Sequence, residues 1–136
     1  MARSRRSFLR LLCTLPLVGA GGIDRSGHPD SVVLEEFPVA GLRYYAGSRL
    51  LRTMRSGDAV EIAAEPENAH DPFAVRIAYR GRRIGYVPRQ RNRAIATLLA
   101  QCARVEGVIS TVDADAAPWE AVRVRLTLAP AARDGR

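Results

Sequence analysis

The sequence predicts a small, mostly β domain with one main helix, in which an antiparallel sheet curls into a barrel or closes on the helix. Several short segments alternate apolar and polar residues with the period of two that is typical of half-buried strands. One longer segment, residues 89–103, has apolar residues at helical spacing instead. The 136 residues fit one domain with one core, and no internal repeat is visible.

The first predicted strand covers residues 36–46 and is interrupted at Gly41, where a bulge or a close backbone approach is common. Arg43, Tyr44 and Tyr45 stand at its end. Residues 48–54 predict a short helix or turn, because their leucines and methionine recur at helical spacing.

The remaining strands follow from alternation. Residues 59–64 predict a second strand, and residues 75–79 a third. Arg80 and Gly81 predict the turn of a hairpin whose second strand, residues 83–87, ends at Pro88. The last two predicted strands cover 105–112 and 121–128, and the link between them is acidic and rich in alanine.

The main predicted helix spans residues 89–103. Its apolar stripe consists of Ile95, Leu98, Leu99 and Cys102, and we interpret the cysteine as a small core residue. Its first turn contains three arginines, Arg89, Arg91 and Arg93. Cations at this end oppose the helix dipole, so these arginines call for an explanation beyond a solvated charged face.

Residues 1–20 have the architecture of an export signal: a basic start, a short apolar run and small residues at the exit. Residues 4–10, SRRSFLR, closely resemble the twin-arginine signal, which implies export of the folded protein from a bacterial cytoplasm. We therefore expect a periplasmic or secreted protein, or a cytoplasmic one if this leader is not functional. The apolar run is too short to span a membrane. Residues 21–35 predict a flexible linker, and residues 131–136 a frayed tail.

The charge gives only a weak indication of the partner. The formal charge is +7, and all 21 basic residues are arginine. Without residues 1–20, 17 arginines face 14 acids, which leaves +3. This mild excess favours an anionic partner only slightly.

The polar loop at residues 65–75, EPENAHDPFAV, lies between two predicted strands. Pro72 fixes its own φ and favours an extended backbone at Asp71. Asn68 and Asp71 can each turn a side chain back onto the backbone and build the turn in which they lie. A structural role for these two residues is therefore the first alternative to a functional one.

Most enzyme templates are absent. The sequence has no lysine and so no phosphate-binding loop of the usual type, no nucleophile elbow, and no recognisable zinc-ligand spacing. Glu65, Glu67 and Asp71, with Asn68, could hold a magnesium or calcium ion, which leaves a metal-dependent nuclease as a third hypothesis. We expect no cofactor and no catalytic residue.

A nucleic-acid-binding role fits the residues better. Single strands are held by aromatic side chains beneath the bases and by positive charge along the backbone, and Arg43, Tyr44 and Tyr45 offer both. A carboxylate only accepts hydrogen bonds, so Asp71 could select a free sugar hydroxyl at a strand terminus, where a phosphate would be repelled.

Residues 36–130 resemble a HIRAN domain. Three blocks carry the resemblance: VAGLRYY at 39–45, VEI at 60–62 with the loop at 65–75, and IGYVP at 84–88. The resemblance implies an OB-like, partly open antiparallel barrel that captures the 3′ end of single-stranded DNA.

The resemblance also implies roles for five residues. Arg43 would contact the backbone, Tyr44 would stack on the terminal base, and Asn68 with Asp71 would line the pocket for the 3′-hydroxyl. His70 would add a smaller stacking surface, at a position where family members that bind DNA ends carry tyrosine. Neither the ATPase motor nor the zinc-binding RING that accompanies this domain in larger proteins is present.

The leading hypothesis is therefore a non-enzymatic module that binds single-stranded DNA or another nucleic-acid end. Export would take the protein out of the cytoplasm, away from the replication forks where single-stranded DNA ends occur. The alternative is accordingly an exported envelope protein that uses the same groove for a peptide, a glycan or a nucleotide.

Overall fold

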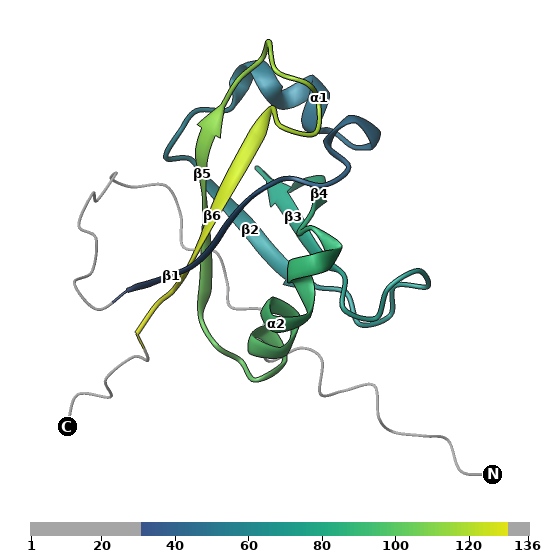
Figure 1. Cartoon of the computed structure of the whole chain (residues 1–136), viewed down its shortest axis with the longest axis vertical. Coiled ribbons are helices and arrows are strands. Elements are labelled where there is room, and N and C mark those ends of the chain that lie inside the picture. Colours follow the sequence, from purple (N-terminus) through teal and green to yellow (C-terminus); the bar gives the residue numbers. More distant parts are fainter. Residues whose placement is uncertain (1–30, 131–136) are drawn as a thin grey trace.

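A computed structural model describes residues 31–130, which form one six-stranded antiparallel sheet with two helices (Figure 1). The expected export signal and frayed tail lie outside the described residues. The strands are β1 Val32–Pro38, β2 Ala59–Ala64, β3 Val75–Tyr79, β4 Arg82–Tyr86, β5 Val105–Val112 and β6 Val122–Leu128. The helices are α1 Gly47–Leu50 and α2 Arg89–Ala100, with two short 3-10 turns, η1 Leu42–Tyr44 and η2 Leu51–Thr53.

The sheet curls until its two edge strands nearly meet. The strand order is β1-β6-β5-β2-β3-β4, so β1 and β4 are the edges. Just beyond β1, Ala40 forms an isolated antiparallel bridge with Tyr86 of β4, in which each backbone N–H donates to the other's carbonyl at 2.9 Å. This bridge is the seam of a partly open barrel, and it confirms the predicted fold class.

The barrel interior holds the hydrophobic core. Five of the six strands contribute fully buried side chains, which include Phe37, Ile77, Ile84, Ile109 and Leu126, and β2 contributes Val60, which is 8% exposed. Burial of this apolar surface is the main driving force for the fold. Alternation along β6, where Val122, Val124 and Leu126 are buried, matches the predicted pattern.

The first strand differs from its prediction. It begins at Val32, inside the expected linker, and ends at Pro38 instead of continuing to residue 46. Val32 and Val33 pair with β6 through their backbones while their side chains remain exposed. Gly41 then adopts a left-handed conformation (φ 76°), which reverses the chain into the turn Leu42–Tyr44. Arg43 and Tyr44 therefore lie on a turn instead of a strand.

The hairpin and the short helix agree with their predictions. Arg80 and Gly81 both have positive φ (49° and 76°), as a two-residue type I′ turn requires. The short helix predicted at 48–54 is formed by α1 and η2.

The main helix ends three residues early. Its last turn is a Schellman motif, in which Cys102 adopts a left-handed conformation (φ 57°) and the N–H of Ala103 donates to the carbonyl of Leu98. Cys102 is therefore exposed in a turn, and its interpretation as a core residue was wrong. Asn92, Ile95 and Ala96 are instead the buried residues of α2. Within residues 31–130, no helix is long and apolar enough to cross a membrane.

Candidate nucleic-acid interface

Three segments of the chain meet at one corner of the barrel. The bridge between Ala40 and Tyr86 places the turn after β1 beside the end of β4. The N–H of Val87 donates to the carbonyl of Val75 at 3.0 Å, which places the β4–α2 junction beside the end of the loop at 65–75. The turn Leu42–Tyr44 and this loop are thus both connected to the end of β4, with the turn beside α1 and the loop lower on the same side, next to α2 (Figure 1).

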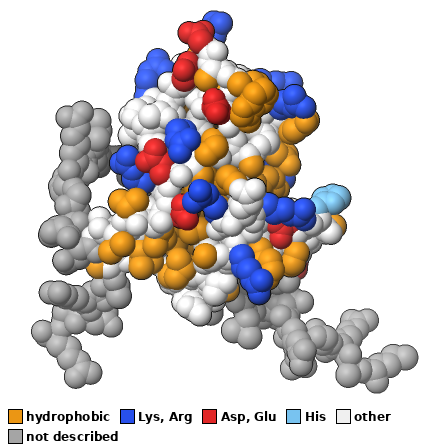
Figure 2. Space-filling view, in the orientation of Figure 1, with side chains coloured by type: hydrophobic (Ala, Val, Ile, Leu, Met, Phe, Trp, Pro, Cys, Tyr) orange, Lys and Arg blue, Asp and Glu red, His pale blue; other side chains and the backbone are white. Residues whose placement is uncertain are grey.

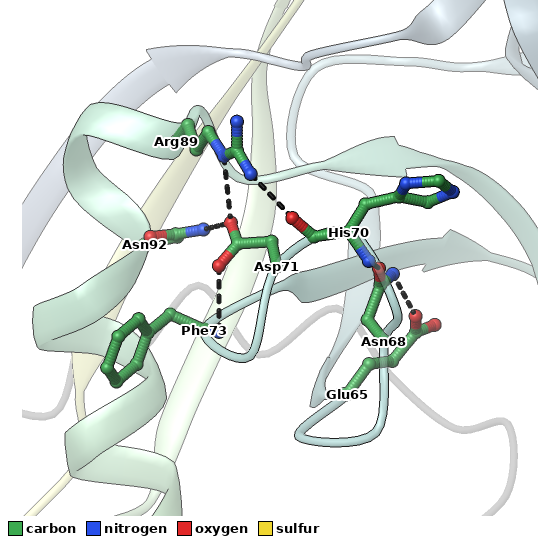
Figure 3. A network of polar contacts seen from close by, with 7 residues as sticks. All are labelled: Glu65, Asn68, His70, Asp71, Phe73, Arg89 and Asn92. Atoms are coloured by element: carbon green, nitrogen blue, oxygen red, sulfur yellow. Dashed lines mark hydrogen bonds and ion pairs between the residues drawn. The ribbon is translucent and has the colours of Figure 1, made fainter.

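The loop at 65–75 is braced by two Asx turns (Figure 3). Oδ1 of Asn68 accepts a hydrogen bond of 2.9 Å from the N–H of His70, and Oδ1 of Asp71 accepts one of 2.9 Å from the N–H of Phe73. The N–H of Glu65 donates to the carbonyl of Ala74 at 2.8 Å and closes the loop at its base. Asn68 and Asp71 therefore fill the structural role that the sequence allowed.

Asp71 also fastens the loop to α2. Its Oδ2 accepts hydrogen bonds from Nδ2 of Asn92 at 2.7 Å and from Nε of Arg89 at 3.4 Å (Figure 3). Arg89 also donates to the carbonyl of His70 at 2.6 Å. The N–H of Phe73, then the Asn92 amide, then Arg89 hold the pKa of Asp71 below its ordinary value, against a smaller opposing effect of desolvation. Asp71 is thus an ionised acceptor held in a fixed position.

Tyr86 connects the loop to the turn after β1. Its hydroxyl donates to Oε2 of Glu65 at 3.0 Å and accepts from Arg83 at 2.9 Å, and its ring lies edge-on to Tyr45 with centroids 5.6 Å apart. Asn68 donates to the same Glu65 oxygen at 3.2 Å. Desolvation and the neighbouring carboxylate raise the pKa of the Tyr86 hydroxyl. The two parts of the corner are therefore joined through Tyr45, Tyr86 and Glu65.

The turn after β1 presents an aromatic ring to solvent among positive charges. Tyr44 is 70% exposed, and the Arg43 guanidinium lies 4.6 Å from its ring centroid and donates to its hydroxyl. Beside them is an open hollow of about 360 Å³. The hollow is lined by Arg43, Tyr44, Tyr45, Ala46, Ser48, Arg49 and Arg82. Exposed aromatics and arginines are the groups that hold single-stranded nucleic acids.

A family model for the HIRAN domain matches residues 33–129. The chain belongs to the HIRAN domain family. HIRAN domains are nucleic-acid-binding modules, so the resemblance seen in the sequence is confirmed at this level.

Two solved structures resemble this HIRAN domain. A protein from Lactobacillus plantarum is 28% identical with a TM-score of 0.63, over 72% of this chain and 94% of that one. The HIRAN domain of human HLTF is 23% identical with a TM-score of 0.57, over 72% of this chain and 78% of that one, and at this identity it shows the fold alone. No curated protein matches the chain.

The structure brings the predicted site residues of the HIRAN domain to one corner, in two groups. Arg43 and Tyr44 lie on the turn, whereas Asn68, His70 and Asp71 lie on the loop. No hydrogen bond among residues 31–130 joins the first two directly to the loop. Their roles in binding stay a prediction.

Sequence reasoning assigned no site role to Tyr86 or Asn92, and it singled out Arg89 only as a cation at the start of the helix, without naming its partner. Asn92 carried a recognisable signal, since it precedes Ile95 by three residues and Ala96 by four on one face of α2, where a polar residue needs a partner. The other two contacts span about twenty residues of chain and have no local signal.

The cluster expected for a metal-dependent nuclease does not form. In the part of the chain that the structure describes, no three His, Cys, Asp or Glu side chains are grouped so that they could hold a metal ion. Oε2 of Glu65 bonds to Tyr86 and Asn68, and Oδ2 of Asp71 to Asn92, so these carboxylates are directed to different partners.

Proposed function

We propose that this HIRAN domain binds single-stranded DNA at its 3′ end without catalysis. The observation that carries the proposal is the 70% exposed ring of Tyr44, with Arg43 against it, at the same corner as the fixed carboxylate of Asp71. A stacking surface, a cation and an acceptor are what a strand terminus requires.

The turn supplies the base and backbone contacts. A terminal base stacks on the Tyr44 ring, a contact worth roughly 1–3 kcal/mol per base in single-strand-binding proteins. Arg43 offers its charge to the adjacent phosphate, and the arginine-lined hollow beside it continues the positive surface. The left-handed conformation of Gly41 fixes the direction in which both side chains project.

The loop supplies selectivity for the terminus. The two oxygens of a carboxylate have about four lone-pair positions, so Asp71 can accept a hydrogen bond from a 3′-hydroxyl in addition to those from its present donors. A 3′-phosphate would meet the negative charge of Asp71 instead. His70 has an exposed side chain and can stack at the edge of this position.

The test is fluorescence anisotropy of the full chain with short single-stranded DNA that ends in either a 3′-hydroxyl or a 3′-phosphate. We expect tighter binding of the hydroxyl. Asp71→Asn keeps a carbonyl oxygen for the Phe73 amide but removes the charge, so it should abolish the preference. Tyr44→Ala should weaken the binding of both DNA probes, because it removes the stacking surface.

Affinity should also fall as salt rises, with a log-log slope of about −0.7 for each phosphate neutralised. Binding that ignores the terminus, or that does not change with Tyr44→Ala, would contradict the proposal.

A further inference from the structure

Of the three arginines at the start of α2, two are paired with acids and one is not. Arg89 contacts Asp71 at 3.4 Å, and Arg91 contacts Glu35 at 2.6 Å. Arg93 has no acidic partner among residues 31–130. The helix dipole acts mainly on the first turn, so it has little effect on Arg93, which is the fifth residue of α2.

Arg93 instead lies against an aromatic ring. Its guanidinium carbon is 5.0 Å from the ring centroid of Phe73, which is 37% exposed. The ring is held in place by the Asx turn in which the Phe73 N–H donates to Asp71 (Figure 3). The pair is thus a guanidinium cation over an aromatic ring that a rigid loop holds at the protein surface.

The pair adjoins the proposed terminus site. Phe73 is two residues from Asp71 in the same loop, and in Figure 3 its ring lies over α2, on the side away from His70. Arg89 and Arg93 are four residues apart, so they lie about one helical turn from each other on one face of α2. Figure 2 shows arginine and hydrophobic side chains interspersed over the face of the molecule in view.

We propose that Phe73 and Arg93 form a second nucleic-acid contact, at which a base upstream of the 3′ terminus stacks on the Arg93 guanidinium while Phe73 supports it from below. The chemistry is that of single-strand binding, in which bases stack on guanidinium planes and aromatic rings and the charge attracts the backbone. This contact rests on the proposed function and extends it from the terminal nucleotide to the strand behind it.

The test compares a dinucleotide with an octanucleotide, both with a free 3′-hydroxyl, on the full chain. The wild type should bind the octanucleotide more tightly. Phe73→Leu and Arg93→Gln should each weaken octanucleotide binding roughly 5- to 150-fold, as loss of one stacked base predicts, with dinucleotide binding unchanged. Arg93→Lys keeps the charge and loses the plane, so it should behave like Arg93→Gln.

Arg104→Gln is the matched control. Arg104 is exposed beyond the other end of α2 and pairs with Glu106, so its loss removes one positive charge away from the contact. It should leave both affinities within about two-fold, since an exposed ion pair contributes little. Thermal unfolding of each variant checks that the loop and helix remain folded.

Failure of this contact can be distinguished from failure of end recognition. The wild type could prefer a 3′-hydroxyl while Phe73→Leu and Arg93→Gln change the affinity for neither the dinucleotide nor the octanucleotide. That result would contradict the proposed Phe73–Arg93 contact and support end recognition. If the variants weaken only the octanucleotide while the terminus makes no difference, the contact stands and end recognition is wrong. Wild-type affinity of Arg93→Lys for the octanucleotide would contradict stacking on the guanidinium. Absence of DNA binding by the wild type would contradict both the contact and end recognition.

Discussion

The side-chain amide of Asn92 donates a hydrogen bond of 2.7 Å to Oδ2 of Asp71, and this bond joins helix α2 to the loop at 65–75. Asn92 is only 4% exposed, so the bond lies at the boundary between the core and the candidate interface. The position of the loop is consequently set in part by α2.

Asn92→Ala should destabilise the fold by about 1–3 kcal/mol, because it removes a buried donor and leaves Oδ2 of Asp71 with one partner fewer. Urea unfolding followed by circular dichroism measures the change. Gln90→Ala is the control, since Gln90 is an exposed amide on the same helix and should change stability by less than about 0.5 kcal/mol. Equal effects of the two substitutions would show that the Asn92 bond contributes nothing.

Stability should fall in acid, and Asp71 should contribute to the fall. Its pKa in the folded chain lies below the ordinary 3.8, so its contribution is fully present above that value and is lost as the pH falls through the lower folded pKa. Asp71→Asn should flatten this part of the profile of unfolding free energy against pH. Glu36, whose pKa Arg125 also lowers, adds a second contribution in the same direction, so Glu36→Gln provides the comparison. An unchanged profile in Asp71→Asn would contradict the assignment.

His70→Tyr should raise the affinity for single-stranded DNA by about five-fold, because a phenol ring offers more stacking area than imidazole, at roughly 1 kcal/mol. His70 is exposed and its side chain forms no hydrogen bond among residues 31–130, so the fold should not change. Anisotropy titration measures the gain. Ala69→Tyr, at the exposed neighbouring position, tests whether any added aromatic has the same effect, and an equal gain there would remove the role assigned to His70.

Gly85→Ala should open the barrel seam. A Cβ at this position would collide with the carbonyl oxygen of Ala40 and the side chain of Val39, both of which belong to the segment that crosses to β4. We expect a loss of roughly 3 kcal/mol, at the upper end of the usual cost of overpacking. Ala59→Val adds methyl groups at an exposed position of β2 and serves as the control. Unfolding midpoints that match the wild type in both variants would show that the seam tolerates the extra volume.

We propose further that residues 1–20 direct export of the folded protein. A fusion of this segment to a reporter that folds in the cytoplasm should reach the periplasm of a bacterium with a twin-arginine translocation system. Arg5→Lys with Arg6→Lys should retain the reporter in the cytoplasm, because the motif requires the arginine pair. Arg3→Lys, outside the pair, is the control, and export that survives the double substitution would contradict the proposal.

The parts of the fold that could be predicted from sequence are those with local causes. The period of two in β3 and the Arg80–Gly81 turn depend on neighbouring residues alone. The start of β1 could not be predicted in the same way, because Val32 and Val33 are exposed and owe their strand conformation to pairing with β6, almost a hundred residues away. The end of α2 depended on a left-handed Cys102, a conformation that its residue type does not suggest.

The same distinction holds for the candidate site. The Asx turns at Asn68 and Asp71 are local, and the sequence indicated them. The bond from Asn92 and the ring contact between Tyr45 and Tyr86 join segments whose proximity follows only from the closed sheet. Some residues of the candidate site could thus be predicted from the sequence, but the long-range contacts that hold them in position could not.

The seam between Ala40 and Tyr86 has a consequence for local opening. Because an isolated bridge, and not a continuous ladder, closes the barrel there, its two amides should exchange with deuterium before those of Ile109 and Val124, which lie in the interior strands β5 and β6 of the sheet. Tyr44 follows Ala40 by four residues, and the loop at 65–75 contacts Tyr86 through Glu65. A DNA end that contacts both Tyr44 and the loop would slow exchange at Ala40 and Tyr86, because the bound ligand would hold the two edges of the barrel together.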